Sequence, residues 1–83
     1  MEGLYSMRNQ IDIMLVMLNA LREPKRITPL MFAVGTNWTC IKYHIEIAFK
    51  YKLIFRDAHF YHLNNRGYRF LELMERANIE IPD

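Results

Sequence analysis

A stripe of polar residues between positions 39 and 50 carries the side chains best suited to recognise another molecule. Apolar residues at 41, 45, 48 and 49 recur at helical spacing, so one face of a helix is expected to be buried. The opposite face then carries Thr39, Lys42, Tyr43, Glu46 and Lys50. Hydroxyl, phenol and ammonium groups at this spacing can contact phosphate oxygens and base edges. An ordinary solvated helix face is the alternative, and the negative charge of Glu46 favours it.

Histidine and cysteine are the residues from which a metal site or a nucleophile would be built. The sequence has neither a Cys-x-x-Cys nor a His-Glu-x-x-His motif, and Cys40 with His44 is only one pair, whereas a zinc site needs three or four protein ligands. A thiol–imidazole nucleophile would also need an orienting group and an oxyanion site. No glycine-rich phosphate loop is present. We therefore expect no metal, no cofactor, no catalytic residue and no small-molecule substrate.

Length and composition predict one domain over residues 1–83, with its core at about 7–76. Of the 83 residues, 52% are hydrophobic and 24% are charged, which suits a folded globular chain. Lys and Arg number 11 against 9 Asp and Glu, a net charge of +2. Overall charge is therefore too low to predict a nucleic-acid partner, and the placement of the charges has to decide.

The same composition predicts a cytoplasmic protein. Cys40 is the single cysteine, so no disulfide can form within the chain, as is typical of a reducing compartment. The apolar stretch over residues 11–21 contains Asp12 and Asn19 and is too short to span a bilayer. Residues 1–5 lack the pattern of a signal peptide. We expect no membrane partner.

Residues 7–22 are expected to form the first helix. Apolar side chains recur there at spacings of three and four, at Met7, Ile11, Met14, Leu15, Leu18 and Leu21. Ser6 is the expected N-cap, and Pro24 ends the helix because proline disfavours helical geometry in the residue before it. A second set of apolar residues lies outside the main stripe, namely Ile13, Val16 and Met17.

A short helix is expected next, at residues 30–34. Residues 25–27 before it are short and extended. Thr28 is the expected N-cap and Pro29 the first helical residue, where proline is well tolerated. Gly35 ends the helix, since glycine takes the left-handed conformation at little cost.

The polar stripe lies on the following helix, which Asn37 is expected to cap and which should run to about Tyr51. Trp38 is expected to extend its apolar face upstream, and Phe49 to belong to that face. Two helices joined by a tight glycine turn form a helix-turn-helix.

A hairpin and a last helix complete the chain. Residues 53–56 and 60–63 are rich in strand-forming types and flank a tight turn. Asn64 is then the expected cap of a helix with an apolar stripe. The order helix, short strand, helix, helix, strand, turn, strand, helix predicts an α+β fold of the winged helix-turn-helix type, with the hairpin as its wing.

Five segments in the same order resemble the small winged-helix DNA-binding domains of archaeal regulators and chromatin-associated proteins. They are Ile11–Met14, Arg26–Met31, Asn37–Ile45, Lys52–Ile54 and Tyr61–Gly67. The sequence departs from that family at Lys52, where a glycine usually turns left-handed, at a cost on the order of 1 kcal/mol. It also has Asn64 and Asn65 where threonine and glutamate are usual. The resemblance suggests an archaeon, or one of its viruses or plasmids, as the source.

The resemblance implies that residues 37–51 enter the major groove of double-stranded DNA, while the wing and the start of the preceding helix lie on the backbone. We therefore expect a transcription regulator associated with the nucleoid. The expected DNA-contacting residues are Arg26, Thr28, Asn37, Thr39, Lys42, Tyr43, Arg56 and His59. Arg66 and Arg69 are expected to extend the basic rim around them.

Two other functions stay open. Winged helices also dock polypeptides, and the low net charge and the surplus of apolar residues favour a protein-interaction module. A non-specific architectural chromatin protein is the other. The apolar residues that one small core cannot bury further predict a homodimer. The resemblance to winged-helix regulators implies that its interface is formed by the first helix, the last helix or both.

Overall fold

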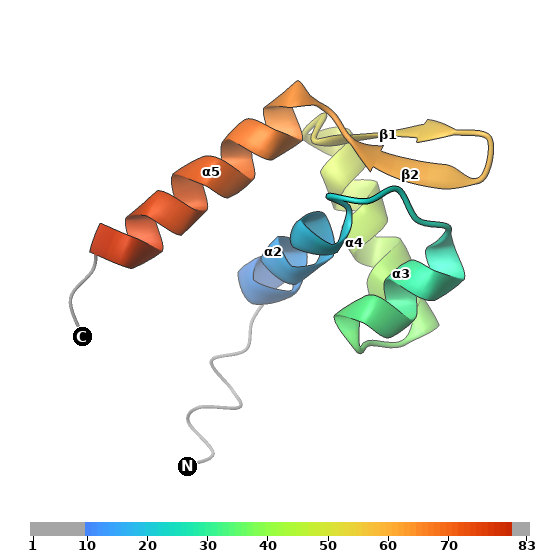
Figure 1. Cartoon of the computed structure of the whole chain (residues 1–83). Helices are drawn as coiled ribbons and strands as arrows, with labels where there is room; N and C mark the ends of the chain where they lie inside the picture. The colour runs from blue at the N-terminus through green and yellow to red at the C-terminus, as the bar shows by residue number, and fades with distance from the viewer. Residues whose placement is uncertain (1–9, 81–83) are drawn as a thin grey trace, which may run out of the picture.

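The computed structural model describes residues 10–80 and has the expected order of elements (Figure 1). These are α2 (Gln10–Ala20), α3 (Ile27–Val34), α4 (Trp38–Lys50), β1 (Ile54–Asp57), β2 (Phe60–Leu63) and α5 (Asn65–Glu80). Figure 1 shows α2, α3 and α4 grouped together, the β1–β2 hairpin projecting above α3, and α5 extending to the opposite side. The α+β winged-helix prediction is confirmed. The expected N-cap Ser6 and the expected first helical residue Met7 lie outside the described residues.

The core forms where the three grouped helices meet the base of the hairpin and α5. Its largest fully buried apolar side chains come from α2, the turn that follows it, α3 and α4, and are Met17, Leu18, Leu21, Leu30 and Ile41. Leu53, Ile54, Leu63 and Leu71 close it from the hairpin and α5. Met17 was expected to lie outside the main buried stripe of this helix. That prediction is wrong, because its side chain is fully buried. Because α2 packs against α3, α4 and α5, more than one of its faces is covered. No helix within residues 10–80 is long and apolar enough to cross a membrane.

The start of α3 corrects the expected cap. The helix begins at Ile27, so Arg26 takes the N-cap position with an extended backbone and makes no side-chain capping bond. The first helical bond runs from the amide of Leu30 to the carbonyl of Arg26 at 3.0 Å. Thr28 is therefore the second helical residue and Pro29 the third. Proline is tolerated there because the first four amides of a helix have no intrahelical acceptor.

The turn between α3 and α4 has the expected local signals. Gly35 is left-handed with φ of 76°, and its amide bonds to the carbonyls of Met31 and Phe32. The side-chain oxygen of Asn37 accepts the amide of Cys40 at 2.8 Å, so Asn37 caps α4 as expected. These two residues position α4 relative to α3.

Two aromatic residues of α4 lie nearer the surface than expected. Trp38, expected to extend the buried face, is 49% exposed, because the first residue of the helix projects past the end of the core. Its ring lies under the ammonium of Lys42, with Nζ 5.7 Å from the ring centroid. Phe49 is exposed too, and its ring packs against Tyr61 of the hairpin at 6.1 Å. Helical spacing had grouped both with the core.

The hairpin is antiparallel, with Ile54 opposite Leu63 at its base and Asp57 opposite Phe60 at its tip. Its two-residue turn contains Ala58 in the left-handed region, with φ of 55°. Lys25 pairs with Tyr61 through two backbone hydrogen bonds, of 2.8 and 3.2 Å. The short extended segment expected before α3 is thus a single bridge that ties this segment to the wing.

The hairpin meets α5 through a close approach of two backbones. The amide of Asn64 donates to the carbonyl of Leu53 at 3.1 Å, and Gly67 lies directly beneath that carbonyl. A Cβ at position 67 would overlap the Leu53 oxygen, so only glycine fits. Lys52, just before, is left-handed with φ of 60°. The backbone at this position therefore takes the left-handed conformation although the residue is lysine.

Candidate nucleic-acid interface

The exposed face of α4 carries the stripe expected from the sequence. Ile41, His44, Ile45 and Ala48 are buried, whereas Thr39, Lys42, Tyr43, Glu46 and Lys50 are all exposed. The stripe runs the full length of the helix that follows the Gly35 turn. Lys42 has no ion-pair partner among the described residues, so its ammonium is available to an external anion.

The first turn of α4 presents a smaller polar group. Asn37 is exposed, but its side-chain oxygen is engaged by the amide of Cys40. Its amide NH₂ is left to donate to a ligand. Thr39, two residues on, is exposed beside it. The N-terminus of α4 also has the positive end of a helix dipole, and its first turn contains no acidic residue.

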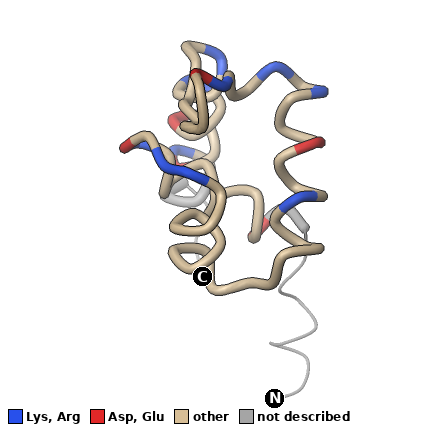
Figure 2. The backbone as a smooth tube through the Cα atoms, turned by 90° about the vertical axis from the view of Figure 1, so that its right-hand side faces the viewer, with Lys and Arg blue, Asp and Glu red and all other residues tan. Residues whose placement is uncertain are grey.

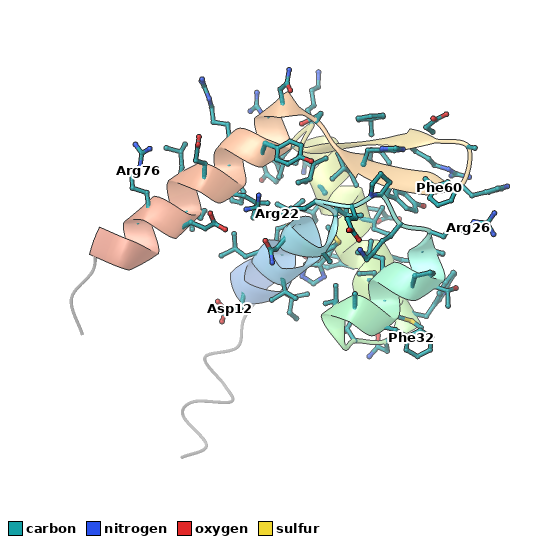
Figure 3. All side chains as sticks on the ribbon, viewed as in Figure 1. Asp12, Arg22, Arg26, Phe32, Phe60 and Arg76 are labelled. Carbon is teal, nitrogen blue, oxygen red and sulfur yellow. The ribbon has the colours of Figure 1, made fainter. Side chains whose placement is uncertain are left out.

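A second group of exposed cations lies at the wing. The guanidinium of Arg26 lies 5.4 Å from the ring centroid of Phe60, and Figure 3 shows both residues beside the hairpin. Arg56 donates from Nε to the carbonyl of Ala58 at 2.9 Å and lies 5.9 Å from the ring of Tyr61. These contacts hold the two guanidinium groups against aromatic rings and leave donors free on each.

The Lys25–Tyr61 bridge brings together residues that the sequence separates widely. It places Arg26 and Thr28, at the start of α3, on the same side of the fold as the wing. His59 lies in the exposed turn of the hairpin. Phe60 was not singled out in the sequence, because its position beside Arg26 depends on strand register and on the bridge.

Arg66 and Arg69 were expected to extend the basic rim around these residues. They line a groove between α4 and α5, together with Lys50 of the exposed face of α4. The start of α5 is fixed by Asn64 and Gly67 against the base of the hairpin, and this sets the direction in which α5 leaves the hairpin. Helical spacing alone could not reveal that orientation.

The surface charge is mixed. Figure 2 shows Lys and Arg distributed over several elements, with Asp and Glu between them. Two ion pairs are present among the described residues: Arg22 with Glu75 at 2.9 Å, and Lys25 with Glu23 at 3.9 Å. Both involve well-exposed carboxylates and contribute little stability. Attraction for an anion therefore depends on local cations such as Lys42 and Arg26.

Cys40 and His44 lie side by side, with Sγ and Nδ1 3.6 Å apart. Nδ1 is also 2.8 Å from the carbonyl oxygen of Cys40. A carbonyl can only accept, so Nδ1 carries the proton and cannot take one from the thiol. Residues 10–80 also contain no cluster of three or more His, Cys, Asp or Glu side chains that could hold a metal ion.

Comparison with known families matches the chain over nearly its whole length. A family model described as winged helix-turn-helix covers residues 7–81. No curated protein matches the sequence. The helix-turn-helix at α3 and α4, the wing and the extent of this match together show that the chain belongs to the winged helix-turn-helix family, whose fold in general binds DNA and is typically not enzymatic.

Proposed function

We propose that the chain is a transcription regulator that binds double-stranded DNA with α4 in the major groove. The observation that carries this proposal is the exposed polar face of α4, where Lys42 has no carboxylate partner among the described side chains. In a helix-turn-helix the second helix presents this face to base edges, with its N-terminal residues deepest.

Each expected site residue has a role in this arrangement. Thr39 and Lys42 lie on the first two turns of α4, where a hydroxyl and an ammonium can contact base edges. Asn37 offers its amide NH₂ and Tyr43 its phenol at the groove edge. Around them, the residues proposed to contact the phosphate backbone are Arg26 and Thr28 at the start of α3, and Arg56 and His59 on the wing.

The test is a titration of the chain into labelled mixed-sequence duplex DNA, followed by fluorescence anisotropy at low and moderate salt. Binding should weaken steeply with salt, because cations displace counterions from phosphates. Lys42→Ala should weaken binding further and reduce the salt slope by about one. Arg76→Ala is the matched control, since Arg76 points away from the molecule on α5 (Figure 3). No binding at roughly 10⁻⁴ M protein and low salt would refute the proposal.

A regulator and an architectural protein differ in sequence preference. We favour the regulator because Thr39 and Lys42 carry groups able to read bases, and we place the protein on the nucleoid in the cytoplasm. Selection of bound sequences from a random pool distinguishes the two. Enrichment of one motif supports a regulator, and an unenriched pool with retained affinity supports an architectural protein.

We further propose that the protein acts as a homodimer through α2, α5 or both. Val16 on α2 and Tyr68 on α5 are exposed, at 36% and 44%, and burying them would stabilise so small a domain. Sedimentation equilibrium at high micromolar concentration should show a species of twice 10.0 kDa. A single 10.0 kDa species would rule this out.

One observation favours a protein-binding role as the second candidate. Phe32 is 73% exposed on α3, an eight-residue helix without a charged side chain (Figure 3). Such a residue commonly anchors a protein contact. If the chain fails to bind DNA, a partner that is lost with Phe32→Ser and retained with Lys42→Ala would support this role.

A further inference from the structure

An open groove of about 1380 Å³ lies between α4 and α5. Its apolar surface is formed by Ile47 on α4, Phe70 and Leu73 on α5, Leu53 at the base of the hairpin, and Met14 of α2 at the far end. In Figure 1 the two helices are close beside the hairpin and α5 then diverges from α4. The groove therefore offers an elongated apolar surface to a ligand.

The end of the groove beside the hairpin is positively charged. Lys50, Arg66 and Arg69 line it, and none of its described lining residues is acidic. The ion pairs and side-chain hydrogen bonds of residues 10–80 engage none of these three cations. The first turn of α5 also contains no acidic residue, so the positive end of its dipole is not neutralised there. A carboxylate is the complementary headgroup.

His44 supplies an independent polar feature. It lines the groove but is only 2% exposed, and its Nδ1–H donates to the carbonyl of Cys40 at 2.8 Å. Its Nε2 is then an acceptor, and it is buried with no hydrogen-bond partner among the described residues. Buried acceptors normally have a partner, so Nε2 of His44 can accept a hydrogen bond from a donor group on a ligand in the groove.

We propose that this groove binds an amphipathic hydroxycarboxylate. Its carboxylate lies among Lys50, Arg66 and Arg69, its apolar body lies along Ile47 and Phe70, and a hydroxyl at the other end of that body donates to Nε2 of His44. Tyr43 and Lys50 line the groove and also belong to the exposed face of α4, so the ligand adjoins the proposed DNA contacts. Binding of the ligand does not require the DNA-binding proposal to be correct.

The test uses the 83-residue chain without DNA, titrated by calorimetry with 10-hydroxydecanoate. Decane-1,10-diol lacks the charge and decanoate lacks the hydroxyl, so both should bind at least about tenfold more weakly, as expected for losing a charge-assisted or a buried hydrogen bond. On binding of the hydroxy acid, the ¹⁵N resonance of His44 Nε2 should shift. Equal binding of the diol and the hydroxy acid would overturn the proposal.

Arg66→Gln combined with Arg69→Gln should weaken binding of 10-hydroxydecanoate by about tenfold or more, because two charge-assisted contacts are removed. Arg76→Gln, on the same helix but outside the groove lining, should bind as the wild type does. Circular dichroism checks that each variant is folded, and the comparison of ligands on the wild type holds even if the double variant is not. The dimer interface can also be mapped by NMR in the absence of ligand. If it includes the residues that line the groove, a second copy of the chain occupies the groove and the proposal is overturned.

Discussion

The side-chain amide of Asn64 donates a hydrogen bond of 2.7 Å to the carbonyl oxygen of Lys52, twelve residues earlier in the chain. The oxygen of the same side chain accepts the amide of Gly67 at 2.8 Å and so caps α5. One residue thus fixes both the left-handed turn after α4 and the start of α5. The angle between these helices, and with it the groove between them, depends on this side chain.

Replacing Asn64 by alanine removes both bonds. We expect Asn64→Ala to lower the free energy of unfolding by about 1–2 kcal/mol, the usual cost of losing a cap. Urea unfolding followed by circular dichroism measures it, with Asn65→Ala at the exposed next position as the control. Asn64→Asp keeps the acceptor but loses the donor. Its free energy of unfolding should therefore lie between those of Asn64→Ala and Asn65→Ala. Equal stability of Asn64→Ala and Asn65→Ala would contradict this account.

Gly67→Ala is expected to be destabilising even though alanine is the better helix former. The new Cβ would overlap the carbonyl oxygen of Leu53, a backbone atom that cannot rotate away. Overpacking of this kind costs about 1–3 kcal/mol, more than the roughly 1 kcal/mol gained in helix propensity. The same unfolding experiment detects the loss. An exposed change on α5, Glu72→Ala, should have almost no effect; a Gly67→Ala protein more stable than wild type would disprove the close approach.

Lys52→Gly should stabilise the protein. A left-handed non-glycine residue costs about 1–2 kcal/mol, and the greater freedom of glycine in the unfolded chain offsets about 0.5–1 kcal/mol of this. A net gain of about 0.5–1 kcal/mol is expected from these two terms. Glu46→Gly, at an exposed position within α4, should instead cost about 1 kcal/mol. If both substitutions destabilise alike, the backbone at Lys52 is not strained.

Removing the negative charge from the exposed face of α4 should strengthen DNA binding. Glu46 lies on that face with Lys42 and Lys50, where its carboxylate repels phosphate. Glu46→Gln is expected to raise the affinity for duplex DNA on the order of threefold at low salt, and less at high salt where charges are screened. Glu72→Gln on α5 is the matched control in the anisotropy assay. An equal gain from both would mean that only net charge matters and that α4 is not the contact surface.

The elements of this fold could be predicted because their signals are local. Asn37, Asn64 and Gly35 act on amides and carbonyls within a few residues, so a cap or a stop can be predicted from adjacent positions. Helical spacing correctly placed the stripe from Thr39 to Lys50 on an exposed face. The start of α3 was missed by a few residues because proline is compatible with several positions in a first turn.

Several features were decided only by tertiary packing. Met17 is buried because α2 has neighbours on more than one side, Trp38 is exposed because the core ends below it, and Arg66 and Arg69 line a groove because of how α5 leaves the hairpin. Periodicity shows which residues share a face of a helix. It does not show which faces other elements cover, because that depends on contacts between residues far apart in the sequence. The amino-acid sequence by itself therefore determined the elements, their order and the exposed polar stripe of α4, whereas the core boundary, the Arg26–Phe60 contact and the α4–α5 groove required the packed structure.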